Sequence, residues 1–459
     1  MVARLAAVGL LLALASAGPV LAQTSPDPPA IEALRSEEDW RAYCASTGPR
    51  TLYPAKCIAL GDAVLLSLGG ELRLRAEIAE DPDLGLGPAR DRVLLNRALV
   101  HADLRLGHGI RLFAQLGSAF ATGRAGGDAP TDEDRFDLMQ GFVDLSTPAG
   151  NGVATLRAGR QEITLGSARL VSVRESPNVR RSFDGARGFW TAARARVDAF
   201  YLQPIALERG LLDDRTQDGE ALWGAYATLP LLTGARAGMD LYYLGYRRTD
   251  AVFASGTARE RRHSLGLRLF GQSGAFDWDL EAVRQFGSFG SDDIKAWTFA
   301  SNIGWTVGPL PWSPRFGLKA DIASGDSRAG DGKLGTFNAL YPKLPYFTEA
   351  GLVAPANIMD LHPTITLAPS EGVSLAAGLN LLWRHRAADA FYAPPLVPVT
   401  EFKSRSRFVG SQAELSVAWE PRRGLEMKAW YVRFAVSDAL RRSGARSTNF
   451  LAASIATKF

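Results

Sequence analysis

The sequence predicts an all-β fold, a transmembrane antiparallel β-barrel of about 18 strands with a short N-terminal periplasmic extension. Three observations predict it. From Leu68 onward, apolar and polar residues alternate with a period of two, as they do in strands. The links between these segments are alternately short and long. After residue 23 the chain has no apolar run of about eighteen residues, so a membrane-spanning form requires a closed barrel.

The first residues predict export. Arg4 precedes an apolar run from Leu5 to about Ala17, and we expect a signal peptide that is cleaved after Ala22. A membrane-anchoring helix is the weaker alternative because the run is too short to span a bilayer. The predicted division is residues 1–22 as signal peptide, 23–62 as N-terminal periplasmic extension and 63–459 as barrel.

The extension holds both cysteines of the chain, Cys44 and Cys57. In an oxidising exported compartment we expect them to form a disulfide. Two cysteines without a nearby histidine do not predict a metal site. Ser36 and Asp39 fit a capping box, so we also expect a short helix over residues 36–44.

The first strand indicates which face of the wall meets lipid. Leu72, Leu74 and Ile78 alternate there with Arg73 and Arg75. A lipid-facing arginine at the midplane of such a barrel costs about 2–4 kcal/mol, so two would cost roughly 4–8 kcal/mol. That cost is comparable to the stability of a whole domain. The charged face must therefore line the interior.

The alternation also sets the number of strands. Eighteen segments show it, beginning near residues 68, 92, 109, 135, 152, 185, 195, 218, 236, 260, 274, 291, 313, 359, 372, 407, 423 and 446. Short links such as residues 106–109 alternate with long ones such as residues 121–134 and 247–260. Short turns at one end and long loops at the other are typical of outer-membrane barrels with an even number of strands.

One of the long links is an arginine-rich stretch, residues 159–187, which contains no lysine. The planar, permanently charged guanidinium suits carboxylate or phosphate groups. A long polar segment between two strands is typical of a functional loop. We expect residues 166–187 to fold into the barrel and to supply Arg174, Arg180 and Arg181 to a constriction.

Further charged side chains are predicted on the inner wall. The lumenal arginines are Arg73, Arg75, Arg97, Arg105, Arg111, Arg157 and Arg160, and the candidate counter-charges are Asp103, Glu162 and Asp184. Interleaved carboxylates would keep the arginines from holding an anion too tightly. The alternative is that these pairs only brace the wall. Large aromatic side chains are expected in the interface girdles, namely Trp190, Tyr242, Tyr243, Trp383, Trp430 and Tyr431.

A family resemblance rests on several stretches together. The last residue of the closing strand, Phe459, is similar to the assembly signal of bacterial outer-membrane barrels. From about residue 55 to the C-terminus the chain resembles the alginate export family of such barrels, in KCI with Leu60, GGELRLR (69–75), GRQE (159–162), NVRRSFDG (178–185) and TFNALYP (336–342). GGELRLR alone is weakly specific, and the combination of GRQE with NVRRSFDG is more so. Ala339 departs from the family pattern, in which proline is expected.

The resemblance implies an eighteen-stranded barrel in the bacterial outer membrane that exports a polyuronate through an arginine-lined constriction. The expected partners are an acidic polysaccharide, outer-membrane lipid and lipopolysaccharide, and periplasmic export components, and the expected state is a monomer. A net charge of +4 is too small to imply nucleic acid. A passive channel needs no cofactor, no metal and no catalytic residue.

Two alternatives stay open. The first is a general anion-selective or nutrient porin. The second, from another class, is a β-rich enzyme that acts on polysaccharide. The sequence offers the enzyme little, because it contains neither GxSxG nor HExxH and has only five histidines. A glycosidase with two carboxylates leaves no spacing pattern that would exclude it.

Overall fold

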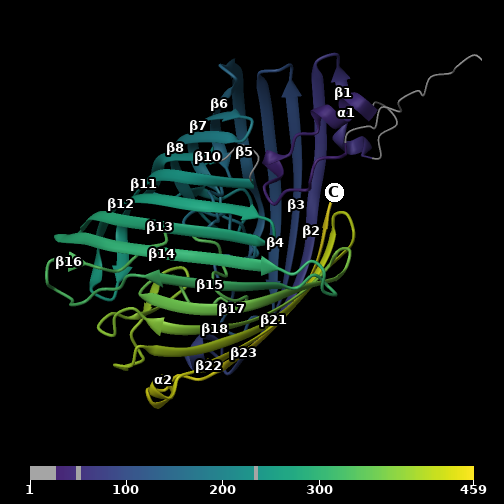
Figure 1. Cartoon of the computed structure of the whole chain (residues 1–459). Coiled ribbons are helices and arrows are strands. Elements are labelled where there is room, and N and C mark those ends of the chain that lie inside the picture. Colours follow the sequence, from purple (N-terminus) through teal and green to yellow (C-terminus); the bar gives the residue numbers. More distant parts are fainter. Residues whose placement is uncertain (1–26, 48–52, 232–235) are drawn as a thin grey trace, which may run out of the picture.

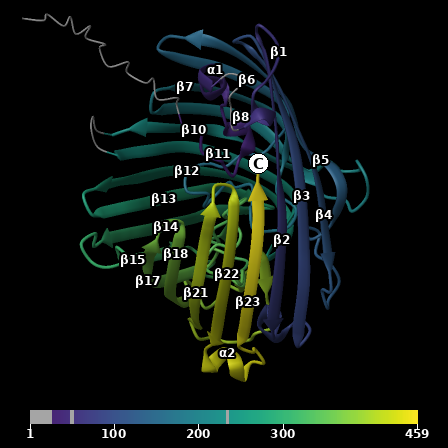
Figure 2. The same cartoon turned by 90° about the vertical axis from the view of Figure 1, so that its right-hand side faces the viewer.

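The computed structural model describes residues 27–47, 53–231 and 236–459. Figure 1 shows a wall of strands that curves around a central space, with short helices at its ends. Figure 2, turned by 90°, shows the first and last long strands side by side. The predicted signal peptide, residues 1–22, lies outside the described residues. Within the described residues, no helix is both long and apolar enough to cross a membrane.

The wall is a closed antiparallel barrel, which confirms the predicted fold. In the described residues it comprises eighteen long strands. They are β2 (Val64–Glu80), β3 (Arg90–Leu106), β4 (Ile110–Thr122), β5 (Asp134–Ala149), β6 (Gly152–Gln161), β7 (Phe183–Ala192), β8 (Ala195–Ala206), β10 (Glu220–Pro230), β11 (Arg236–Phe253), β12 (Gly256–Ser273), β13 (Phe276–Phe289), β14 (Asp292–Thr306), β15 (Arg315–Ala323), β17 (Ile358–Ser370), β18 (Val373–Arg384), β21 (Phe408–Arg422), β22 (Leu425–Val436) and β23 (Thr448–Lys458). Each pairs with the next, and β23 pairs with β2 to close the ring.

Smaller elements sit at the ends of the barrel. They are the 3₁₀ helices η1 (Arg35–Glu37), η3 (Pro54–Lys56) and η4 (Pro82–Gly85), the helices α1 (Arg41–Thr47) and α2 (Asp438–Arg442), and the short strands β1 (Ile58–Gly61), β9 (Arg215–Thr216), β16 (Lys333–Leu334), β19 (Phe391–Ala393) and β20 (Val397–Val399). The closing seam is reinforced by the last residue, because Phe459 and Gly70 exchange two backbone hydrogen bonds of 2.9 and 3.0 Å.

The helix predicted over residues 36–44 is displaced. A 3₁₀ turn ends at Glu37, and α1 begins only at Arg41. The Glu38 side chain explains the break, because it accepts hydrogen bonds from Arg35 and from the Trp40 indole instead of capping a helix. Further along, a disulfide joins Cys44 to Cys57.

The long link predicted over residues 247–260 is not a loop. β11 and β12 continue through it and pair as far as Phe253 and Gly256. Arg247 and Arg261 face each other there, and polar residues occupy both faces of the ribbon. Arginines lie on the outer face of this extension while Ala251 and Phe253 are buried on its inner face, so the polar-in, apolar-out alternation that identifies the other strands is lost there.

The alternation separates a lipid face from an inner face. Leu72, Leu74 and Ile78 are 53%, 43% and 41% exposed on the outside of β2, as an apolar outer band requires. Two aromatic residues predicted for the girdles lie inside instead. Tyr242 donates a hydrogen bond to Glu281, and Trp430 packs under the Arg75 guanidinium. Arg433, which breaks the alternation, points outward near the long-loop end and donates to Asn449.

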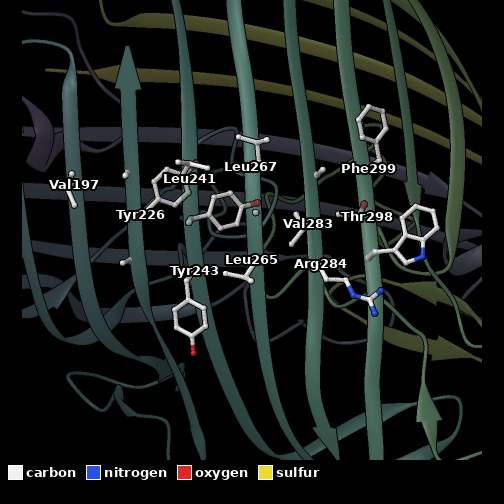
Figure 3. A pocket seen from close by; sticks show the side chains of 16 residues that line it. Val197, Tyr226, Leu241, Tyr243, Leu265, Leu267, Val283, Arg284, Thr298 and Phe299 are labelled. Carbon is white, nitrogen blue, oxygen red and sulfur yellow. The ribbon is translucent and has the colours of Figure 1, made fainter. Parts of the chain in front are cut away.

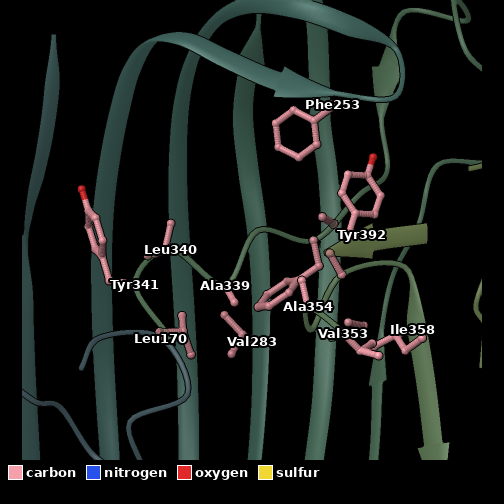
Figure 4. Close-up of a cluster of buried hydrophobic side chains, with 14 of the residues drawn as sticks. Leu170, Phe253, Val283, Ala339, Leu340, Tyr341, Val353, Ala354, Ile358 and Tyr392 are labelled. Atoms are coloured by element: carbon pink, nitrogen blue, oxygen red, sulfur yellow. The ribbon is translucent and has the colours of Figure 1, made fainter. Parts of the chain in front are cut away.

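A hydrophobic cluster fills one side of the interior (Figure 4). It joins inner-wall residues such as Val283 to loop residues such as Leu170, Leu340 and Tyr341. Ala339, where proline was expected, is buried in this cluster at 4% exposure. Apolar residues inside a membrane barrel are buried by loops rather than by lipid, so these loops must be folded into the barrel.

Candidate functional site

Two long loops fold back into the barrel and meet inside it. Residues 162–182 join β6 to β7, and residues 324–357 join β15 to β17. The Tyr341 N–H donates to the Leu170 carbonyl at 2.8 Å, and a β-bridge links Tyr341 to Val171. The arginine-rich loop therefore lies in the lumen and narrows it together with the second loop.

The tip of the arginine-rich loop is held against β2 and β3 by two strand arginines. Arg73 donates to the carbonyls of Glu175 at 2.9 Å and Pro177 at 3.1 Å. Arg97 forms ion pairs of 2.6 Å with both Glu71 and Glu175. Burial alone would raise the pKa of Glu175, but Arg180 and Arg97 lower it to about 2. This carboxylate is therefore charged at any physiological pH and fixes the loop to the wall.

One asparagine completes this attachment. The Asn178 side-chain amide donates to the carbonyls of Asn96, Phe120 and Asp132, at 3.1, 3.1 and 2.8 Å. Asn178 is fully buried. It was not among the functional residues predicted from the sequence, although it opens the NVRRSFDG motif. Its role is to tie three separate segments to the loop.

Consecutive arginines of the motif point in different directions. Arg180 pairs with Glu162 at 3.0 Å and with Glu175 at 3.3 Å, and it donates to the Ala33 carbonyl of the N-terminal segment at 2.6 Å. Arg181 instead places its guanidinium 5.4 Å from the Tyr341 ring centre. Of the three loop arginines predicted for a constriction, Arg180 is thus separated from Arg181.

The N-terminal segment occupies the short-turn end of the barrel. Arg35 donates to the carbonyls of Gly70 at 3.3 Å and Phe459 at 3.0 Å, across the closing seam. Arg111 of the inner wall donates to the Ser36 carbonyl at 2.8 Å. The segment therefore covers part of this mouth. Wall arginines at this end form hydrogen bonds with the segment instead of pointing into open solvent.

Several wall arginines predicted to line the lumen form a ladder with acids on neighbouring strands. Arg111 pairs with Asp103 at 2.7 Å and reaches Asp144 at 3.5 Å, and Arg157 pairs with Asp144 at 2.7 Å. Arg105 joins the same group through Asp103 at 3.2 Å. Most of these groups are at least nine-tenths buried. Such a ladder braces the wall.

Two further predicted arginines are also paired. Arg75 binds Glu77 and Glu349, both at 2.6 Å, and so connects β2 to the second inward loop. Arg160 pairs with Asp184 at 3.0 Å on the neighbouring strand. These contacts leave little of either guanidinium free for a ligand.

Arg174 and Arg181 behave differently, because they come together in a cavity of about 340 Å³. Arg174 is 5% exposed, and its guanidinium makes only a long hydrogen bond of 3.4 Å, to the Pro342 carbonyl. In the described residues neither arginine forms an ion pair. Burial and the neighbouring Arg181 lower the pKa of Arg174, which remains cationic at neutral pH. The cavity therefore holds two cationic side chains that form no direct ion pair in the described residues.

The cavity floor contains one anchored carboxylate. Glu220 accepts hydrogen bonds from Tyr341 at 2.5 Å and Tyr246 at 3.1 Å, and it lies 3.9 Å from a third arginine, Arg248. The second acid of the lining, Glu260, is already neutralised by a buried ion pair of 2.5 Å with Arg262. Cations therefore exceed acids here. The arrangement can hold a carboxylate-bearing group.

Comparison with known proteins identifies the family. A family model described as alginate export matches residues 64–454. The chain belongs to the alginate export family. This confirms the resemblance predicted from the GRQE and NVRRSFDG motifs. A comparison with curated proteins finds no match.

Similar solved structures are porins and related barrels. The chain is similar to Acinetobacter baumannii OccAB1 at 12% identity and a TM-score of 0.58, covering 89% of this chain and 98% of that one. Pseudomonas aeruginosa OpdO is 11% identical with a TM-score of 0.57, covering 86% of this chain and 97% of that one. A BenF-like porin from Pseudomonas fluorescens Pf-5 is 10% identical with a TM-score of 0.56, covering 86% of this chain and 99% of that one. At these identities the likeness shows the fold alone. Family and fold together make the protein an outer-membrane channel, a transport protein.

Two lysines of this alginate export family barrel lie inside without a carboxylate partner. They are Lys319 of β15 and Lys343 of the second inward loop, and neither forms an ion pair in the described residues. Burial lowers the pKa of Lys343 to about 8, and Lys319 and Arg169 contribute to the same shift. The cations predicted as pore-lining site residues from the sequence were all arginines, so neither lysine was among them.

Proposed function

We propose that this outer-membrane channel passes an anionic polysaccharide, an alginate-like polyuronate. The observation that carries the proposal is the cavity in which Arg174 and Arg181 meet and, among the described residues, form no ion pair. A polyuronate presents one carboxylate on each sugar, and a guanidinium binds carboxylate through charge-assisted hydrogen bonds. The family to which the chain belongs, alginate export, supports the same class of cargo.

The composition of the cavity also suits passage rather than retention. Conduction requires an ion to bind strongly enough to enter and weakly enough to leave. Glu220 lies within the same lining and repels carboxylates, so it limits how tightly the arginines hold the polymer. Lys319 and Lys343 supply further unpaired positive charge inside the barrel. A chain of carboxylates can exchange between such sites one sugar at a time.

The ion-paired arginines take a different role in this proposal. Arg97, Arg111, Arg157, Arg160 and Arg180 hold the loops, the wall and the N-terminal segment in place. The constriction is therefore proposed to be selective through two loop arginines and two lysines rather than through an inner wall lined with arginine. Periplasmic export components and a monomeric state remain part of the proposal.

Single-channel recording in planar bilayers tests the proposal. We expect oligomannuronate to block the current of the wild-type channel, and neutral dextran of similar size to leave it unchanged. The double variant Arg174→Gln/Arg181→Gln is expected to need at least about tenfold more oligomannuronate for half block. The loss of even one guanidinium–carboxylate contact costs about 1.5–3 kcal/mol, and 1.4 kcal/mol corresponds to a factor of about ten.

A matched control removes the same charge elsewhere. Arg135 and Arg215 have side chains that are 62% and 76% exposed at the long-loop end. The current of the Arg135→Gln/Arg215→Gln variant should be blocked by oligomannuronate at the same concentration as that of the wild type. Equal block by dextran and oligomannuronate would favour a general porin. If oligomannuronate blocked the cavity variant and the control equally, the cavity would have no role in binding the polymer.

A further inference from the structure

Three arginines cluster on the outer, lipid-facing side of the barrel. Arg247 of β11 lies directly opposite Arg261 of β12, and Arg259 is two residues from Arg261 on the same face. All three are exposed, and together with Tyr201 and Trp223 they line a surface depression of about 490 Å³. Like charges directly opposite each other destabilise a strand pair. Such a cluster needs an anion to offset it.

The protein does not supply that anion. None of the three arginines forms an ion pair in the described residues, and Arg247 donates only to the Tyr201 hydroxyl at 3.1 Å. Glu260 also borders the depression but is 1% exposed and paired inward with Arg262. On the outer face of β14, Asp293 already forms an ion pair with Lys295 at 3.7 Å.

The position of the cluster fits the headgroup layer of the outer leaflet. It lies at the long-loop end, and an aromatic band follows it toward the other end. In this band the rings of His263 and Phe286 stack at 5.3 Å and the Tyr243 hydroxyl contacts His263 Nδ1 at 2.7 Å. Aromatic girdles mark the boundary between hydrocarbon and headgroups in such barrels. The arginines therefore sit just beyond the hydrocarbon, at the level of phosphates.

An apolar groove continues from the band down the same wall (Figure 3). Its volume is about 800 Å³, and its lining combines small residues such as Ala225 and Ala282 with exposed Leu241 and Leu265. Leu265 is four residues from Arg261 on one face of β12, which places it about 13 Å away along the strand. A lipid with an anionic head and acyl chains would contact both features at once.

We propose that the outer wall of β10–β14 binds lipopolysaccharide, with its phosphates on Arg247, Arg259 and Arg261 and its acyl chains in the groove below. Several phosphates on one sugar head match several clustered guanidinium groups, and phosphate accepts the paired N–H donors of arginine. The groove takes the acyl chains by apolar contact. The proposal depends on the outer-membrane location and not on the cargo of the channel.

The experiment purifies the wild-type channel, a test variant and a control variant from outer membranes. Native mass spectrometry then measures how much lipid each one retains. The test variant is Arg247→Gln/Arg259→Gln/Arg261→Gln. The control, Arg90→Gln/Arg92→Gln/Arg433→Gln, removes three outward arginines where Glu80 already offsets charge, through its pair with Arg90 at 3.0 Å. Added lipid A, and the same lipid without phosphates, are then titrated onto delipidated protein.

We expect the wild type and the control to retain lipopolysaccharide. The test variant should bind lipid A roughly a hundredfold more weakly, as the loss of three surface cations near anionic lipid predicts. Dephosphorylated lipid A should bind the wild type as weakly as lipid A binds the test variant. Heat-modifiable migration of each variant shows that the barrel is folded.

Three results would overturn the proposal. One is equal retention by the test variant and the wild type. A second is equal binding of the phosphorylated and dephosphorylated lipids. If control and test variants lose lipid to the same degree, binding follows overall charge and the site is likewise rejected. Polymer block of the current is unaffected in any of these outcomes, so the result is independent of the proposed cargo.

Discussion

Gly159 of β6 lies directly opposite Gly185 of β7, and both have positive φ angles, +127° and +153°. An added Cβ atom would lie 2.3 Å from the Gly141 carbonyl oxygen at the first position and 2.1 Å from the Tyr201 carbonyl oxygen at the second. The arginine-rich loop begins and ends close to this point, where β6 ends and β7 begins. Both family motifs, GRQE and NVRRSFDG, contain one of these glycines.

Substitution of Gly159 by alanine should therefore destabilise the barrel. The backbone conformation and the close carbonyl together predict a loss of about 1–3 kcal/mol in the free energy of unfolding. Gly188→Ala is the matched control, because Gly188 lies on the same pair of strands and a Cβ atom added there would have no neighbour within 4 Å. Urea unfolding in lipid vesicles measures both. Equal midpoints would show that the backbone there is not strained.

Arg97→Ala should be strongly destabilising. It leaves the Glu71 carboxylate, whose side chain is 2% exposed, as a buried charge without its partner. Loss of one member of a buried ion pair typically costs about 3–5 kcal/mol. The double variant Arg97→Ala/Glu71→Gln should recover part of this loss in urea unfolding, since it removes the unpaired charge. A double variant no more stable than Arg97→Ala would contradict the explanation.

The anion selectivity of the channel should fall as the pH rises through about 8. The pKa of Lys343 is lowered to about 8 by burial first and by Lys319 and Arg169 next, so its positive charge is present below that pH and is lost above it. Reversal potentials in a salt gradient, recorded between about pH 6.5 and 9.5, measure the change. Lys343→Arg should remove the pH dependence, because arginine stays charged throughout. A transition unchanged by Lys343→Arg would assign it to another group.

Arg35→Ala should increase the single-channel conductance. Arg35 is 2% exposed and attaches the N-terminal segment to the barrel seam through Gly70 and Phe459. Without it, the segment should leave the short-turn mouth for part of the time. Arg41→Ala is the control, because Arg41 is exposed and pairs only with Asp39 in the described residues. If both variants conduct like the wild type, the segment does not limit the current.

The strands could be predicted because lipid imposes a strict rule on them. A charged residue on the outer face is expensive, so the alternation at residues such as Leu72 and Arg73 shows directly which way each side chain points. The rule ends at the membrane surface, where β11 and β12 continue with polar residues on both faces and were predicted as a loop. Tyr242 and Trp430 show the converse, since an inner face tolerates aromatic residues as well as polar ones.

The cavity could not be predicted from the sequence for a different reason. Arg174 and Arg181 line the same cavity only because Glu220 and Tyr341, from distant parts of the chain, meet the arginine-rich loop inside the barrel. Arg180 and Arg181 are adjacent in the sequence, yet one binds acids and the other stacks on a ring. The number of arginines in the loop indicated the charge of the region but not which of them are left unpaired.

The acceptors of Arg35 come from opposite ends of the barrel sequence, Gly70 on the first long strand and Phe459 just after the last. The two carbonyls stand next to each other only once the ring of strands has closed. The N-terminal segment thus has no complete docking position on a half-built wall. The contact of Arg35 across the seam can therefore form only after the ring has closed, so this contact is a sign of a finished barrel.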